Sequence, residues 1–199
     1  MHKPEKEIIV AAAKRRFAHY GYGKTTMAEI ADDCQMSVGN LYRFYKNKED
    51  IAVEGARTCL DDKAKAAEYA AGQADVAIES LRNYFVVRLR YLHGFMSETP
   101  HMHELVQLIV IKHRDMLQQF EDRARETIRH VITLGINRGE FRTCDTATIA
   151  ADLYNATSKY NMPICMDMPL EILEAELESL MNLLYEGIQV RKSKSGEKE

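Results

Sequence analysis

Asn40, Tyr42 and Arg43 lie close together in the sequence and carry groups suited to nucleic acid recognition. An asparagine amide can pair with two groups of adenine, and an arginine guanidinium can pair with two groups of guanine. Val38, just before them, offers only apolar contact, for example to a thymine methyl group. These residue types predict an element that reads DNA bases, provided that one exposed helix presents them together.

Capping signals around these residues predict the helices that would position them. Thr26 and Glu29 have the spacing of a capping box, in which a hydroxyl and a carboxylate satisfy free N–H groups at a helix start. Residues 34–36 then turn the chain, and Ser37 is placed to cap a second helix that runs to about Tyr45. Two short helices joined by a tight turn predict a helix-turn-helix unit, whose second helix enters a DNA groove.

Order, spacing and residue type in roughly the first quarter of the chain also follow a known pattern. The residues concerned are Phe17, Gly21, Tyr22, Thr25, Thr26, Ile30, Ala31, Gly39, Leu41, Tyr42, Phe44, Tyr45, Lys48, Glu49 and Ile51. With them the segment resembles the tetracycline-repressor (TetR) family of bacterial transcription regulators. The resemblance implies that Thr26 and Lys48 hold DNA phosphates and that Tyr42 contacts the DNA backbone. Hydroxyl and ammonium donors at helix starts suit phosphate oxygens and carry no sequence information.

The predicted DNA-binding set combines the motif and the resemblance. At the position of Phe44 the family often has His or Tyr, and phenylalanine lacks the polar group with which those residues could contact DNA. Leu41 is expected in the core. The set is Thr26, Ser37, Val38, Gly39, Asn40, Tyr42, Arg43, Phe44 and Lys48.

Helical periodicity continues through the rest of the chain and predicts an all-α protein of about nine helices. The first helix has Ile8, Ile9, Ala12, Ala13 and Phe17 on one face and ends near Gly21. Asn47 is the expected cap of a helix to about Ala71, and Asp75 of a helix to about Met96. Residues 101–138 form one helix or two, since residues 112–115 interrupt the apolar face. Asp145 or Thr146 starts a helix to about Asn161, and a last helix runs from Leu170 to about Val190.

The expected domains are residues 1–47, which bind DNA, residues 48–190, which bind an effector and dimerise, and a disordered tail, 191–199. In the family the last two helices usually form a homodimer. The last helix here has an apolar face of Ile172, Leu173, Leu177, Leu180, Met181, Leu184 and Ile188. The partners expected are a palindromic DNA operator, a second copy of the chain and an unidentified small-molecule effector. The function expected is a repressor that the effector releases from its operator.

Aromatic and methionine side chains in the C-terminal region suit an adaptable pocket, because methionine fills irregular apolar spaces. Each could equally be an ordinary core residue. The predicted pocket residues are Phe85, Phe95, Met96, Met102, Met116, Phe120 and Tyr154.

Composition limits the other possibilities. The net charge of the 199 residues is −3, but residues 1–50 alone carry a charge of +2, and binding responds to the local patch. No apolar run is long enough to span a bilayer and no signal-peptide core opens the chain, so we expect a cytoplasmic protein. No catalytic motif and no cofactor motif is present, so neither an enzyme nor a cofactor is expected.

Two alternatives stay open at this stage. A regulator of the same fold could sense metal or redox state through His101, His103 or one of four scattered cysteines, Cys34, Cys59, Cys144 and Cys165, which are expected to be free thiols. The second alternative is a helical ligand-binding or adaptor protein that does not bind DNA. Phe44 and the modest positive charge of residues 1–50 favour it.

Overall fold

The computed structural model describes residues 3–163 and 167–189, and over these residues the chain is all-α, as predicted. The described residues contain no β-strand beyond an isolated bridge between Phe141 and Gln189. The helices, with two short 3-10 segments (η), are α1 (Lys3–Tyr20), α2 (Met27–Asp33), α3 (Val38–Phe44), α4 (Lys48–Ala71), α5 (Ala77–Glu98), η1 (Pro100–Met102), α6 (His103–Lys112), α7 (Arg114–Asn137), α8 (Thr146–Ala156), η2 (Ser158–Asn161) and α9 (Leu170–Ile188). The predicted tail, 191–199, and Cys165 lie outside the described residues.

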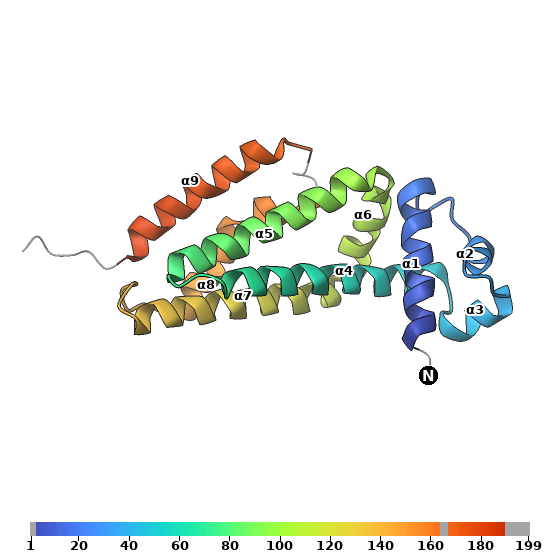
Figure 1. Ribbon diagram of the computed structural model, residues 1–199, viewed down its shortest axis with the longest axis horizontal. Coiled ribbons are helices and arrows are strands. Elements are labelled where there is room, and N and C mark those ends of the chain that lie inside the picture. Colours follow the sequence, from blue (N-terminus) through green and yellow to red (C-terminus); the bar gives the residue numbers. More distant parts are fainter. Residues whose placement is uncertain (1–2, 164–166, 190–199) are drawn as a thin grey trace, which may run out of the picture.

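Figure 1 shows an elongated molecule with α1, α2 and α3 gathered at one end. Helices α4, α5 and α7 run from that end along the length of the molecule, and α9 lies along the outer side of α5. The long helices therefore connect the N-terminal helices to the distant α8 and α9.

The predicted caps of the N-terminal helices are confirmed. The Glu29 backbone N–H donates to Thr26 Oγ1 at 3.3 Å, and the Thr26 N–H donates to Glu29 Oε2 at 2.8 Å, which completes the capping box. Ser37 Oγ accepts from the Asn40 N–H at 3.2 Å. Between the two helices Gln35 has a φ of +53°, a left-handed conformation that tightens the turn. The helix-turn-helix geometry thus comes from interactions only three residues apart.

The hydrophobic core under these helices extends beyond the N-terminal segment. Phe17, Ile30 and Leu41 are buried in it, whereas Ile8, expected on the same face, is exposed. Residues of η1, α6 and α7 complete this core, namely Met102, Leu105, Ile109 and Met116. The N-terminal helices therefore share one core with η1 and α6, which contact α1 and α4 respectively.

A second core joins α4, α5, α7, α8 and α9, and its helix junctions correct one expectation. Asp75 does not cap α5: the cap residue is Val76, and the Ala77 N–H donates instead to Glu140 Oε2 at 2.6 Å. At the same corner Gly135 has no room for a side chain, because an added Cβ would lie 2.6 Å from Phe141 Cε2 and 2.8 Å from Ala77 Cβ. Contacts distant in sequence thus fix where α5 starts and how closely α7 approaches it.

The remaining boundaries largely agree with the sequence. The region 101–138 forms two helices, α6 and α7, separated at His113. On α9 the predicted apolar face is mostly turned into the same subunit: Leu173, Leu177, Met181 and Ile188 are buried, but Ile172 is 47% exposed. This corrects the expected dimer interface. The side chains of this face are largely used in the chain's own core, so only the outer side of α9 is free to contact another subunit.

Candidate DNA-binding face and ligand cavity

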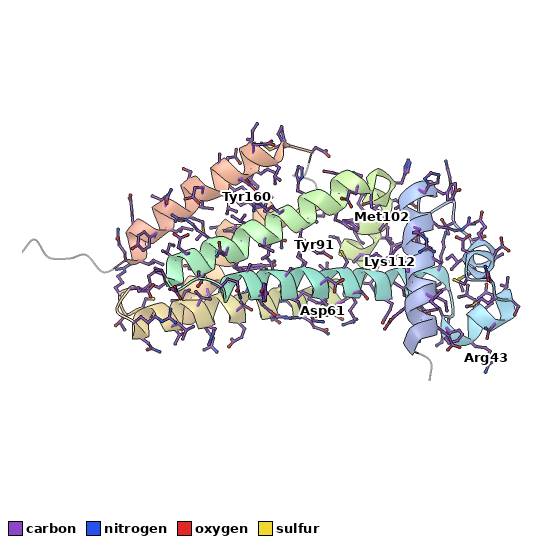
Figure 2. The ribbon with its side chains drawn as sticks, viewed as in Figure 1. Arg43, Asp61, Tyr91, Met102, Lys112 and Tyr160 are labelled. Carbon is purple, nitrogen blue, oxygen red and sulfur yellow. The ribbon has the colours of Figure 1, made fainter. Side chains whose placement is uncertain are left out.

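The outer side of α3 presents several of the predicted DNA-binding residues together. Val38 and Gly39 are exposed at its first turn, and Tyr42 and Arg43 are exposed further along. Asn40 is half-buried, with its backbone N–H used by the Ser37 cap. Figure 2 shows Arg43 at the end of the molecule, pointing away from the long helices. A groove of DNA could approach this side of α3 without meeting α4–α9.

Other members of the predicted set have structural roles at the edge of this face. Thr26 is exposed, but its hydroxyl and its backbone N–H both donate to Glu29 Oε2 at 2.8 Å. Ser37 is occupied as a helix cap, and Phe44 is half-buried and packs on the N-terminal core. In this conformation Thr26 and Ser37 shape the helix starts.

Lys48 is bound within the chain. Its Nζ donates to the carbonyl oxygens of Tyr22 at 2.8 Å and Thr25 at 3.0 Å, and it lies 4.5 Å from the centre of the Tyr22 ring. The ammonium thereby fixes the segment between α1 and α2 to the start of α4. Two exposed lysines that the motif does not include, Lys24 and Lys46, flank the same region and add positive charge there.

A cavity of about 500 Å³ lies between the N-terminal helices and the long helices. Its walls come from α1, α4, α5, η1, α6, α7 and the segment from α8 to Pro163. Figure 2 labels two of its lining residues, Tyr91 of α5 and Met102 of η1. A volume of this size is typical of sites for small organic molecules.

Four of the predicted pocket residues line this cavity: Phe95, Met102, Phe120 and Tyr154. Phe85 lines a much smaller neighbouring pocket. Met96 and Met116 line neither pocket; Met96 is buried in the second core and Met116 in the first. Apolar periodicity alone does not separate a side chain that lines a cavity from one that fills a core.

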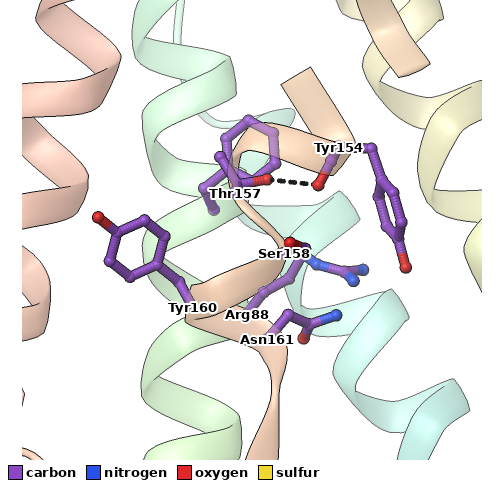
Figure 3. A pocket seen from close by; sticks show the side chains of 7 residues that line it. Arg88, Tyr154, Thr157, Ser158, Tyr160 and Asn161 are labelled. Atoms are coloured by element: carbon purple, nitrogen blue, oxygen red, sulfur yellow. Dashed lines mark hydrogen bonds between the residues drawn. The ribbon is translucent and has the colours of Figure 1, made fainter. Parts of the chain in front are cut away.

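The end of the cavity nearest α8 is polar, and its two buried cations were missed from the sequence. Lys63 on α4 and Arg88 on α5 are each 7% exposed. Lys63 Nζ donates to Asn161 Oδ1 at 3.0 Å, and Arg88 Nη1 donates to the Tyr84 hydroxyl at 3.1 Å. Figure 3 shows Arg88 with Tyr154, Ser158 and Asn161 around the small pocket that adjoins the cavity.

Burial controls the protonation of Lys63. Removal of the ammonium from water, together with the positive charge of Arg88, lowers the pKa of Lys63 to about 7. The one signal in the sequence is at Arg88, which lies between Val87 and Leu89; Lys63, between Asp62 and Ala64, gives no such signal.

Metal or redox sensing would need suitably placed cysteine, histidine or carboxylate side chains. Cys34, Cys59 and Cys144 are free and half-buried. The described residues contain no group of three His, Cys, Asp or Glu side chains placed to hold a metal ion. None of the described helices is both long and apolar enough to cross a membrane.

Family models of known proteins match both the N-terminal and the C-terminal part of the chain. A family model described as bacterial regulatory proteins of the tetR family matches residues 9–54, and one described as the tetracyclin repressor-like C-terminal domain matches residues 77–180. The uncharacterised HTH-type transcriptional regulator YhgD of Bacillus subtilis (strain 168) is 26% identical over 154 residues, which cover 76% of this chain and 81% of YhgD.

Solved structures share the fold. A transcriptional regulator from Cytophaga hutchinsonii ATCC 33406 has a TM-score of 0.75 at 22% identity, covering 94% of this chain and 99% of the other. A TetR-family transcriptional regulator from Pectobacterium atrosepticum has a TM-score of 0.72 at 16% identity, covering 95% of this chain and 96% of the other. With a helix-turn-helix, an all-α C-terminal region and family models matching both, the chain belongs to the TetR family of DNA-binding transcriptional regulators.

Proposed function

We propose that this chain is a homodimeric repressor that binds a palindromic operator and leaves it when a small molecule enters the cavity. Residues 1–47 read the DNA in this proposal, and residues 48–190 bind the effector and dimerise. The observation that carries it is a shared wall: Met102, Leu105 and Ile109 line the cavity and also belong to the core under the helix-turn-helix.

Polar contacts hold both ends of α6 to neighbouring segments, its start to the turn before α2 and its end to the start of α4. At its start, Glu104 Oε2 accepts from the Gly23 backbone N–H at 3.1 Å. At its last residue, Lys112 Nζ lies 3.4 Å from Glu49 Oε2, and just after it His113 Nε2 lies 3.0 Å from Glu49 Oε1. A displacement of α6 by a ligand would therefore be transmitted to the turn before α2 and to the start of α4.

The proposed release is a shift between two populations of the dimer. A ligand changes the balance only if it binds one arrangement of the DNA-reading helices more tightly than the other. Here the ligand would favour the arrangement in which α6 is displaced. Cavity occupancy and operator binding would then oppose each other, and each would weaken the other by the same factor.

A dimer is required because one α3 reads only a few base pairs. The side of α9 that is free of the chain's own core carries the exposed apolar residues Ile172 and Leu183, with Ala175 and Ser179 between them at helical spacing. Two copies joined through α8 and α9 would place their α3 helices on half-sites about 34 Å apart, or slightly more. We expect each α3 to use Asn40 and Arg43 for bases and Tyr42 for the backbone.

Selection of bound fragments from a random DNA pool tests the DNA-binding part of this proposal. We expect the full chain to enrich an imperfect palindrome and to protect both half-sites in footprinting. A variant with Tyr42→Ala and Arg43→Ala is the matched control, since both side chains are exposed and the cavity is untouched. Failure of the wild-type chain to enrich any sequence would refute the proposal, and enrichment of a single, unrepeated half-site would refute its dimeric form.

A further inference from the structure

The cavity lining has a strong excess of positive charge. Five cationic side chains contribute to it, those of Lys14, Lys63, Arg88, Arg114 and Arg125, against the single carboxylate of Glu121. That carboxylate is already neutralised, because Arg114 Nη1 lies 2.9 Å from Glu121 Oε1 and Arg125 Nη2 lies 3.5 Å from Glu121 Oε2. The other cations of the lining therefore have no counter-charge from within the cavity.

Lys63 and Arg88 are the buried members of this set. Among the described residues Lys63 has a neutral partner, the Asn161 amide oxygen, and Arg88 has the Tyr84 hydroxyl and the faces of the Tyr84 and Tyr154 rings. No described carboxylate forms an ion pair with either one. A buried cation without an anion costs several kcal/mol, so its presence beside a cavity indicates a site where an anion binds.

Away from these two cations the cavity is long and its lining is mostly apolar, with Lys14 and the Arg114–Glu121–Arg125 group as its other charged side chains. The lining part of α4 extends from Ile51 to Ala64, about 20 Å at 1.5 Å per residue. Lys63 is near one end of this stretch, and Ile51, with Phe17 of α1, is at the other. Between them the walls are formed by apolar side chains such as Leu60, Leu92, Phe95, Val106, Leu117 and Phe120.

We propose that the effector is an amphipathic carboxylate, whose head binds Lys63 and Arg88 and whose apolar tail extends toward α6 and α1. Asn161 and Ser158 lie beside the two cations and add neutral polar groups for the head. The tail would contact Met102 and Leu105, the side chains shared with the core of the helix-turn-helix. The ligand class follows from the cavity itself; its role as the releasing signal rests on the proposed function.

Calorimetric titration of the purified full chain, without DNA, tests the ligand class. Decanoate, 1-decanol and decylammonium share one tail and differ in the charge of the head. We expect decanoate to bind at least about tenfold more tightly than decanol, since a charged hydrogen bond gains more than a neutral one, and decylammonium to bind least. Equal affinity for decanoate and decanol, or tighter binding of decylammonium, would overturn the proposal.

Substitutions then locate the head. Lys63→Met and Arg88→Met should each remove most of the preference for decanoate and leave decanol binding within about twofold of wild type. Lys65→Met is the matched control, because Lys65 lies on the same helix, is exposed and does not line the cavity. Arg88→Lys should restore part of the preference, which separates loss of charge from loss of packing. Retention of the full preference in both methionine variants would refute the assignment.

Proton uptake gives a readout that a purely structural role would not change. The charged and titratable side chains that act on Lys63 are Arg88 on α5 and Cys59 on α4. Others in the same lining are Tyr91 on α5, Glu121 and Arg125 on α7, and Tyr154 on α8. Because the pKa of Lys63 is about 7, a carboxylate beside it should raise that pKa and draw in a proton at neutral pH. The binding enthalpy should then depend on the ionisation enthalpy of the buffer in wild type and not in Lys63→Met. Buffer-independent binding in wild type would contradict the head position.

The ligand titrations and the DNA selection can fail independently of each other. Operator binding with no preference for decanoate would refute the ligand class and leave the DNA-binding proposal intact. A preference for decanoate that depends on Lys63 and Arg88, without enrichment of any DNA sequence, would refute the regulatory proposal and leave the ligand site standing.

Discussion

Replacement of Lys63 by methionine should stabilise the protein, most strongly at and below neutral pH. The side chain is 7% exposed, and methionine keeps its unbranched shape while removing the charge. In the unfolded chain the lysine has its ordinary pKa of 10.5, whereas burial and Arg88 lower the pKa to about 7 in the folded chain. Below about pH 7 the native state must therefore hold a buried charge that the unfolded state holds in water.

The size of the effect follows from this difference in pKa. A fall from 10.5 to about 7 is about 3.5 units, and each unit corresponds to about 1.36 kcal/mol, which gives a penalty of about 5 kcal/mol at low pH. Loss of the hydrogen bond to Asn161 offsets about 1 kcal/mol of the gain. We expect Lys63→Met to raise the free energy of unfolding by about 3 kcal/mol or more near pH 7.

The pH dependence is the distinguishing part of the prediction. Between about pH 7 and pH 10.5 the unfolded lysine keeps its proton and the native lysine has lost it, so wild-type stability rises with pH relative to the variant. The advantage of Lys63→Met should therefore shrink by about 1.4 kcal/mol per pH unit and disappear near pH 10. Urea unfolding at several pH values and one fixed protein concentration measures it.

Lys65→Met provides the baseline, because Lys65 is exposed and Asp61 raises its pKa, so the native protein does not lose this proton before the unfolded chain does. A difference between wild type and Lys63→Met that stays constant over that range would show that water in the cavity solvates the ammonium fully. The reasoning about a buried, unpaired charge would then fail.

Three further predictions concern DNA reading, packing and assembly. Arg43→Ala should relax the preference at one base pair per half-site by about 1–3 kcal/mol, measured by binding to operator variants. Gly135→Ala should lower the free energy of unfolding by about 1–3 kcal/mol, since its Cβ would meet Phe141, whereas Gly94→Ala, with open space around it, should be neutral or slightly stabilising in urea titrations. Leu183→Asp should produce a folded monomer with weak operator binding, seen by sedimentation and circular dichroism, because Leu183 is 67% exposed. Leu177→Asp should instead unfold the C-terminal region, because Leu177 is fully buried.

Each of these has a contradicting result. Equal weakening of specific and random DNA by Arg43→Ala would remove Arg43 from the base-reading residues. Equal stability changes for Gly135→Ala and Gly94→Ala would mean that the corner of α7 adapts freely. A Leu183→Asp protein that still sediments as a dimer would exclude the outer side of α9 from the interface.

Local interactions explain what the sequence predicted well. The caps at Thr26, Ser37 and Asn47 each join groups three residues apart, so residue type and spacing were sufficient to place the starts of α2, α3 and α4. The left-handed glycine at 21 likewise ends α1 where expected. The presence of the DNA-reading helix could thus be predicted before any tertiary structure was known.

Interactions between distant segments explain what was missed. Glu140 caps α5 from 63 residues away, and Lys48 binds carbonyl groups 23 to 26 residues before it. Lys63 and Arg88 point into one cavity only because α4 and α5 pack side by side, and no local pattern reports that alignment. Met96 and Met116 were predicted for the pocket because their type fits one, and tertiary packing places them in the cores.

The shared core of α1–α4 and α6 also limits how this protein can be recombined with its relatives. A hybrid that joined the first 47 residues to another regulator's C-terminal region would remove Met102, Leu105 and Ile109 from beneath Phe17 and replace them with side chains selected for a different partner. The DNA-reading helices are thus an exchangeable module only when α6 is transferred with them. Over evolutionary time, substitutions in α6 should track those in α1 more closely than those in α9, even though the contacting positions are about ninety residues apart in the sequence.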